Sequence, residues 1–272
     1  MRLKTILICS IFFLSNLVSG QDSLGNNSPF ISSSFDSFKQ GEWLKFRVHY
    51  GIFNASYATI DLKEDLLNDK KVFRSIAIGR TTGIARIFFR LDDIYESYFD
   101  KNIVKPLKSK RNIYEGGYTK NDEIEYDYNN KIAIVNNIKN NTIRKVPIKE
   151  NVQDIISTFY FLRNHFDVSK LKINDFIKIT MFFDADNYNF KMKFLGYENI
   201  KTKFGTVNCS KFRPYIESGR VFRDSESLTL WVSNDKNKIP IKIEAELRIG
   251  SIEADLEGFK GLKFPFKIII NE

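Results

Sequence analysis

The side chains best suited to chemistry or ligand binding gather around one predicted helix, residues 152–166. Asp154 and Ser157 are three residues apart and therefore share one helical face near the helix start. They could form a polar pair facing a cavity, but we favour a role for Asp154 in beginning the helix by offsetting the positive end of its dipole. Tyr160 lies on the same side of the predicted helix as Ser157. Arg163 could bind an anionic headgroup or the last helix carbonyls, and the structural role is favoured.

Two glutamates suggest a glycosidase pair, because Glu115 and Glu198 each stand where a strand meets a glycine turn. A glycosidase needs its two carboxyl groups about 5 to 9.5 Å apart across a cleft. Nothing in the sequence brings these two together. We interpret both as strand-end acids that accept hydrogen bonds from turn amides, and keep Glu115 as a candidate for ligand binding.

A tryptophan and a basic cluster are the other candidates for contact with a ligand. Trp231 alternates with leucine and valine residues along a predicted strand, so it faces a different environment from them and could line a binding surface. Arg80, Arg86 and Arg90 are interspersed with isoleucine and phenylalanine. Such a stretch could place a loop or short helix on lipid headgroups, although a solvated face is the simpler interpretation.

Composition limits the chemistry further. The chain carries a net charge of +9 without a long Lys/Arg run, and His49 and His165 are its only histidines. With two histidines, neither a Ser-His-Asp catalytic site nor a histidine-rich metal site is indicated. Phosphate-binding glycine loops and nucleic-acid recognition patterns are absent from the sequence. We expect no catalytic residue, no metal, no cofactor and no nucleic-acid partner.

The first 20 residues have the pattern of a secretory signal peptide, with a basic start, an apolar core and a small-residue cleavage site. Cleavage would leave Cys209 as the only thiol and no transmembrane anchor. Residues 21–40 are rich in Ser, Asn and Gly and are predicted to form a flexible leader. Within the leader, Asp22-Ser23-Leu24 resembles a short O-glycosylation pattern of some Bacteroidetes.

From residue 41 onward, alternating apolar residues and turn signals predict a single β-rich domain, residues 41–272. In the first strand we expect the alternate residues 44, 46, 48 and 50 to face inward. Two similar strand starts suggest related half-sheets at 41–150 and 169–272. So many strands with one helix predict a strongly curved or barrel-like antiparallel sheet, the helix covering its concave side above a cavity.

A set of short motifs in a fixed order resembles the DUF3108 family over about residues 41–256. The motifs lie at residues 41–42, 114–116, 154–157, 160–163, 196–198, 205–207 with Cys209, and 231–235 before 239–240. The resemblance implies an exported envelope protein of Gram-negative bacteria. By analogy it also suggests the fold of LolA/LolB-like proteins, whose curved sheets enclose a cavity for acyl chains.

These observations predict a non-enzymatic protein of the periplasm, or of the periplasmic face of the outer membrane. It would bind an amphiphile, lipid or envelope polymer in the cavity between sheet and helix. The alternatives are a structural or assembly partner of an envelope protein complex and, third, a hydrolase of envelope carbohydrate.

Overall fold

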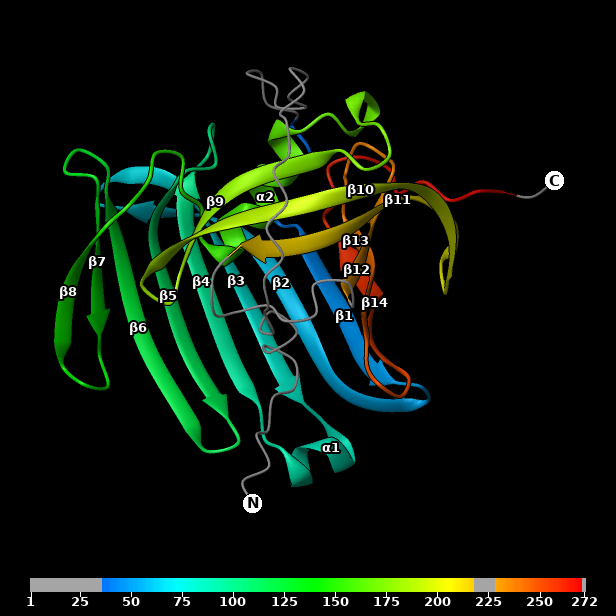
Figure 1. Ribbon diagram of the computed structural model, residues 1–272, viewed down its shortest axis with the longest axis horizontal. Coiled ribbons are helices and arrows are strands. Elements are labelled where there is room, and N and C mark those ends of the chain that lie inside the picture. Colours follow the sequence, from blue (N-terminus) through cyan, green and yellow to red (C-terminus); the bar gives the residue numbers. More distant parts are fainter. Residues whose placement is uncertain (1–35, 218–227, 271–272) are drawn as a thin grey trace.

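The computed structural model describes residues 36–217 and 228–270 and consists of one large curved sheet wrapped around a helix (Figure 1). The predicted signal peptide, most of the leader and the Asp22-Ser23-Leu24 motif lie outside the described residues. The first eight strands are β1 (Trp43–Tyr50), β2 (Phe53–Leu67), β3 (Lys70–Thr81), β4 (Asp92–Asp100), β5 (Pro106–Glu115), β6 (Tyr118–Asp127), β7 (Ile132–Asn137) and β8 (Thr142–Pro147). The last six are β9 (Phe176–Phe183), β10 (Asp186–Thr202), β11 (Gly205–Glu217), β12 (Leu228–Ser233), β13 (Pro240–Glu246) and β14 (Ser251–Lys260).

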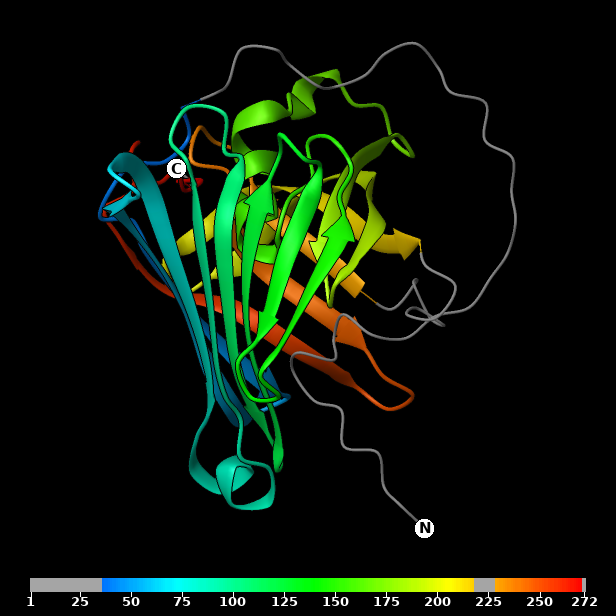
Figure 2. The same cartoon turned by 90° about the vertical axis from the view of Figure 1, so that its left-hand side faces the viewer.

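All 14 strands belong to one antiparallel sheet in the order β8-β7-β6-β5-β4-β3-β2-β1-β14-β13-β12-β11-β10-β9. Each half of the chain forms a meander, and the two meanders meet where β1 pairs with β14. The expected mainly β fold with a strongly curved antiparallel sheet is confirmed. Figure 2 shows the curvature, which brings the two meanders to face each other around the helix.

The edge strand β9 is covered by the segment that leads into the helix. Gln153 donates its backbone N–H to Thr180, and the N–H of Phe182 donates to the carbonyl of Gln153. At the start of β10, the side chain of Asn187 donates to the backbone carbonyl of Pro147 in β8, at 2.8 Å. The sheet therefore curls until its two edges are linked, which protects edge groups that would otherwise pair with other chains.

The first strand follows the expected alternation for three of its four apolar positions. Leu44, Phe46 and Val48 are buried, but Tyr50 is exposed and His49 is buried in its place. The pairing of β1 with β2 shifts register between Val48 and His49. The extra residue of this bulge, Ala55, lies in β2. Tyr50 is the last residue of β1 and its hydroxyl donates to the carbonyl of the exposed Ile249, so the expectation that Tyr50 faces inward was wrong.

Helix α2 (Ile155–His165) lies within the curve of the sheet, where the sequence predicted it. It begins three residues later than expected, because residues 152 and 153 run along β9 instead. Asp154 is its N-cap: the carboxylate accepts from the N–H of Ser157, and the Ser157 hydroxyl accepts from the N–H of Asp154. The favoured helix-starting role of Asp154 is thus confirmed.

The described part of the chain contains two helical elements besides α2, the helix that the sequence predicted. One is α1 (Gly83–Phe88), between β3 and β4, and the other is the 3-10 helix η2 (Val168–Lys170). The main apolar core fills the space between α2 and the sheet. Tyr160 of α2 is fully buried there against Phe38 and Phe99, with ring centroids 4.7 and 5.2 Å away.

Candidate functional site

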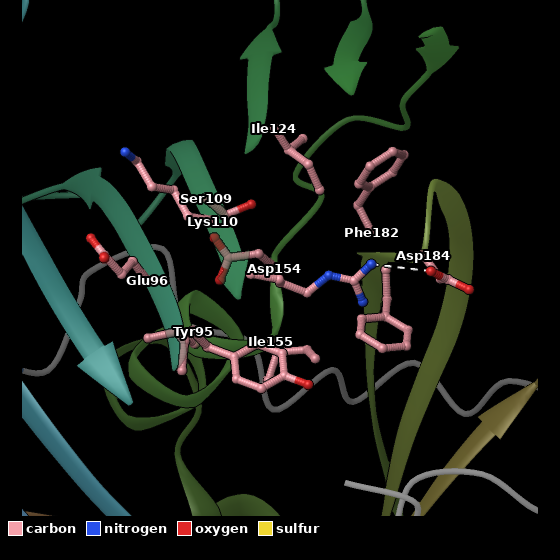
Figure 3. A pocket seen from close by; sticks show the side chains of 12 residues that line it. Tyr95, Glu96, Ser109, Lys110, Ile124, Asp154, Ile155, Phe182 and Asp184 are labelled. Carbon is pink, nitrogen blue, oxygen red and sulfur yellow. Dashed lines mark hydrogen bonds and ion pairs between the residues drawn. The ribbon is translucent and has the colours of Figure 1, made fainter. Parts of the chain in front are cut away.

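A small pocket lies where the start of α2 meets the sheet (Figure 3). Asp154 stands in its wall, and one carboxylate oxygen accepts from the hydroxyl of Ser97 at 2.6 Å. The opposite wall contains Phe182 and Asp184, at the turn between β9 and β10. The pocket volume is about 20 Å³, which is room for about one water molecule. An acyl chain would need far more space than this pocket offers.

Burial raises the pKa of Asp154 to about 6, even though Ser157 and Ser97 donate hydrogen bonds that favour its charged form. Above that pH the carboxylate is charged inside the core. Relative to its ordinary pKa of 3.8, this costs about 3 kcal/mol of folding free energy. The folded state binds the proton more tightly than the unfolded state. Stability from this group is therefore present below about pH 4 and is lost as the pH rises to 6.

We expect Asp154→Asn to remove this pH dependence. Asparagine keeps the N-cap and cannot ionise, so its stability relative to the native protein should rise by up to about 3 kcal/mol between pH 4 and pH 7. Urea unfolding of both proteins at several pH values measures the difference. A difference that stays constant over this range contradicts the prediction. Asp154→Ala, which also loses the cap, should be about 1 kcal/mol less stable than Asp154→Asn.

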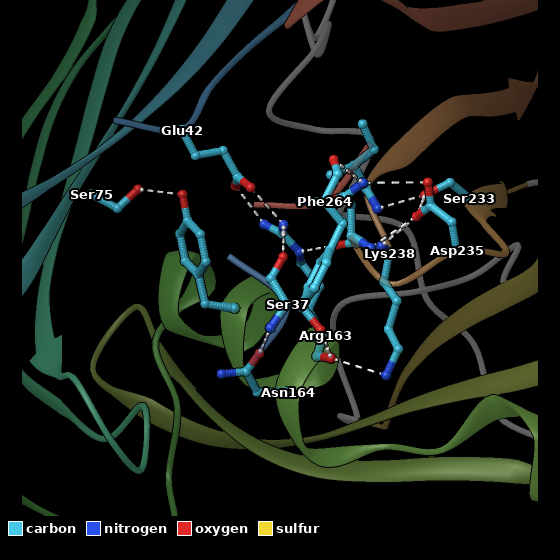
Figure 4. Close-up of polar contacts among 12 residues, drawn as sticks. Ser37, Glu42, Ser75, Arg163, Asn164, Ser233, Asp235, Lys238 and Phe264 are labelled. Atoms are coloured by element: carbon cyan, nitrogen blue, oxygen red, sulfur yellow. Dashed lines mark hydrogen bonds and ion pairs between the residues drawn. The ribbon is translucent and has the colours of Figure 1, made fainter. Parts of the chain in front are cut away.

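The predicted ligand residue Arg163 is enclosed by the protein's own groups (Figure 4). Its guanidinium makes two parallel bonds to the Glu42 carboxylate, at 2.6 and 2.7 Å, and its Nε donates to the carbonyl of Asn237 at 2.9 Å. Both charged side chains are buried. Because Glu42 neutralises Arg163 bidentately, the structure supports the structural role of Arg163.

Two other predicted residues of α2 also contact the core. The hydroxyl of Tyr160 lies 3.3 Å from the hydroxyl of Ser75 on β3. Ser157 is fully buried and completes the cap with Asp154. Both side chains are fully buried.

Trp231 lies on the sheet beneath two lysines. Its ring is buried, and its Nε1 donates to Glu198 at 3.0 Å. The ammonium groups of Lys211 and Lys242 lie 5.1 and 5.5 Å from the ring centroid. Glu198 lies within β10 and binds Trp231 and Lys211, so the interpretation of Glu198 as a strand-end acid was wrong. Glu115 is the last residue of β5, and its backbone forms an isolated bridge with Leu91.

The three predicted surface arginines do come together, around Asp92 at the start of β4. Arg86 binds the carboxylate through both terminal nitrogens, at 2.9 and 2.8 Å, and Arg90 donates to it at 2.6 Å. Arg80 lies 3.8 Å away. The bond from Arg86 above all holds the pKa of Asp92 down to about 2. One carboxylate therefore organises three positive charges beside α1.

Helix α1 presents its apolar side chains to solvent instead of the core. The exposed fractions of Ile84, Ile87 and Phe88 are 73%, 81% and 85%. None of the α1 residues is buried. The helix is held in place at its base, where Arg86 is fixed by Asp92 and the N–H of Thr82 donates to Ala55 of β2. Figures 1 and 2 show it protruding at one end of the sheet.

Three exposed residues at the end of the sheet that carries α1 were not predicted as candidates from the sequence. Ile52, Phe53 and Ile249 are large apolar residues in or beside turns, and all are strongly exposed. Each lies within two residues of a turn glycine, Gly51 or Gly250. Turn residues are usually small or polar, so an apolar residue at such a position was the available signal.

Among the described residues, those best placed to hold a metal ion are His49, Glu253 and Asp255, whose ligand atoms lie within 4.8 Å of one another. Both ring nitrogens of His49 lie 2.8 Å from oxygen atoms, one of the Gly51 carbonyl and one of the Asp255 carboxylate. Arg47 lies 3.5 Å from Asp255, and Lys242 lies 2.8 Å from Glu253. We interpret the cluster as an ion-pair network between β1, β13 and β14.

In the part of the chain that the structure describes, no helix has the length and apolar character needed to cross a membrane. A comparison with curated proteins gives no match.

A comparison with solved structures gives several matches. A β-barrel-like protein of the domain of unknown function DUF1849, from Brucella abortus, has a TM-score of 0.52 at 10% identity, and the match covers 84% of this chain and 100% of that one. A protein from Bacteroides fragilis described as exported and of YmcC-like fold has a TM-score of 0.33 at 9% identity, and a lipoprotein from Parabacteroides distasonis has 0.32 at 13%. Each of these two matches covers 84% of this chain and 99% of the other.

The family expected from the order of motifs is confirmed by a family profile with the description "Protein of unknown function (DUF3108)". Its match begins within β1 and ends within β14, so it includes α2, the Asp92 cluster and most of the sheet. With residues 45–257 matched, this chain belongs to the DUF3108 family.

Proposed function

We propose that this protein is an exported, non-enzymatic envelope protein that binds a lipid surface through α1 and the arginines beside it. The observation that carries the proposal is the exposure of Ile84, Ile87 and Phe88 on a helix with no buried residue. Large apolar side chains that point into water together mark an interaction site. Transfer of each into an apolar environment contributes roughly 1.5 kcal/mol or more.

The charges next to α1 favour an anionic lipid surface. Arg80 and Arg90 expose more than half of their side chains, and Asp92 neutralises only one of the three arginines. An amphipathic element of this kind places its apolar residues just below the headgroups, while basic side chains stay at the phosphate level. Each basic group near such a surface contributes about 1 kcal/mol.

The test is co-sedimentation of the chain from residue 21, the predicted mature form, with vesicles of phosphatidylethanolamine and phosphatidylglycerol. Phe88→Ser should weaken binding about tenfold or more, because it removes one inserted aromatic side chain. Leu66→Ser is the matched control: Leu66 is also exposed, but lies at the other end of the β2–β3 hairpin. The control variant should bind like the native chain.

Native protein that stays in solution, or equal loss in both variants, contradicts the proposal. The first result would favour the alternative of an assembly partner in an envelope protein complex, for which the same apolar tip would contact protein.

An amphiphile held between the sheet and α2 is the other candidate function. The resemblance to LolA/LolB-like proteins supports it, but the side chains of the main core lie between the sheet and α2, and the pocket at Asp154 has only about 20 Å³. Such a ligand would have to displace α2. Native mass spectrometry of protein purified from its own envelope tests this: a stoichiometric amphiphile supports it, and an apo mass contradicts it.

A further inference from the structure

The strand directions place three chain reversals at one end of the sheet. β1 is antiparallel to both β2 and β14, β2 is antiparallel to β3, and β14 is antiparallel to β13. Strands β1, β3 and β13 therefore run in the same direction. The turns that follow them are the β1–β2 turn at 51–52, the α1 segment at 82–91 and the β13–β14 turn at 247–250. Figure 1 shows all three toward the lower end of the molecule.

Each of these reversals carries exposed apolar side chains. Ile52 of the first turn and Phe53, the first residue of β2, are 88% and 70% exposed, and Ile249 of the β13–β14 turn is 80% exposed. With Ile84, Ile87 and Phe88 of α1, they form a set that we name the rim. Six large apolar residues in water at one end of a protein call for a partner surface.

Backbone and side-chain contacts hold the parts of the rim together. The hydroxyl of Tyr50 donates to the carbonyl of Ile249 at 2.9 Å, which joins the β1–β2 and β13–β14 turns. Gly250 has φ +72°, and a Cβ there would lie 2.8 Å from the Tyr50 hydroxyl oxygen. The close packing of Tyr50 on this glycine keeps Ile249 at the tip. On the other side, the N–H of Thr82 donates to Ala55, which joins α1 to β2.

We propose that the rim docks end-on to a lipid bilayer with anionic headgroups, α1 and the two turns inserting together. This inference rests on the proposed function and adds the full binding surface and the orientation of the protein relative to the bilayer. Arg248 is exposed beside Ile249, and Arg80 and Arg90 flank α1, so positive charge accompanies the apolar tips on both sides of the rim. The apolar side chains of the rim lie on three separate chain reversals with arginines beside them. The headgroup region of a bilayer is fluid and accepts such side chains to a depth of about 5–10 Å.

Single-cysteine labelling tests the rim directly. Phe53→Cys, Phe88→Cys, Ile249→Cys and the opposite-end control Leu66→Cys are each labelled with an environment-sensitive fluorophore; Cys209 is fully buried and is left in place. Vesicles containing phosphatidylglycerol should shift the emission at positions 53, 88 and 249, and lipid-attached quenchers should quench it. Position 66 should not respond.

The outcomes separate this inference from the proposed function. Response at 88 alone, with silent labels at 53 and 249, overturns the rim and leaves binding through α1 in place. Silence at all three positions, together with no co-sedimentation, overturns both.

A charge variant tests the choice of headgroup. Arg248→Ala should weaken binding to phosphatidylglycerol vesicles about fivefold, whereas Lys71→Ala, an exposed position at the opposite end, should not change it. Equal binding to purely zwitterionic phosphatidylcholine vesicles contradicts the anionic partner.

Discussion

Replacing Glu42 by alanine is expected to lower the free energy of unfolding by about 3–5 kcal/mol. The substitution leaves the Arg163 guanidinium buried without its bidentate partner, among the rings of Phe38, Phe159 and Tyr160, which lie about 5 Å from it. Desolvation makes an unpaired buried charge costly. Urea unfolding at pH 7, monitored by tryptophan fluorescence, measures the loss.

The double variant Glu42→Leu with Arg163→Met is the control for this experiment. Removing both charges in favour of apolar side chains of similar size is often neutral or stabilising, so the double variant should recover most of the lost stability. If Glu42→Ala costs less than about 1 kcal/mol, or if the double variant is as unstable as the single one, the pair does not act as an isolated buried ion pair.

Tyr160→Ala is the second substitution with a large expected effect, about 3–5 kcal/mol of unfolding free energy. Tyr160 is fully buried and contacts Phe38, Phe99 and Phe159 edge-on or tilted, with centroids between 4.7 and 5.2 Å. Truncation opens a cavity at the point where α2, the segment before β1 and the sheet meet. Thermal and urea unfolding should show the loss.

The matched control is Tyr160→Phe, which keeps the ring and removes only the hydroxyl near Ser75. Its cost should be about 1 kcal/mol, the net worth of one hydrogen bond. Equal effects of the two variants would show that the hydroxyl, and not the packing, is what stabilises this position. A cost of Tyr160→Ala below about 1 kcal/mol would show that the core is not packed around it.

These two predictions bear on function because they divide the predicted α2 residues from the surface ones. The α2 residues form hydrogen bonds within the protein that hold α2 and the segment before β1 against the sheet: Arg163 to Glu42, Tyr160 to Ser75 and Ser157 to Asp154. Arg80 and Arg90 are exposed beside an apolar tip. Variants at the first group should change stability, and variants at the second should change binding to a lipid surface.

Most strands of this protein and helix α2 can be predicted from the amino-acid sequence alone. An apolar period of two is the direct consequence of side chains alternating across a strand, and it predicts strands wherever turn residues bound it. Helical spacing and an acid at the start predicted α2, and Asp154 is its N-cap. An ordered set of short motifs indicated the family, which the profile match confirms. These features are local, so neighbouring residues contain enough information.

The contacts between groups far apart in the sequence depend on the tertiary structure. Glu42 and Arg163 are 121 residues apart and become partners because the segment before β1 packs against α2. His49 is buried because β1 pairs with β14, which brings the Asp255 carboxylate to 2.8 Å from its ring. The rim joins turns from both halves of the chain because β1 pairs with β14. Such contacts depend on strand order, register and curvature, which hydrophobic periodicity does not encode.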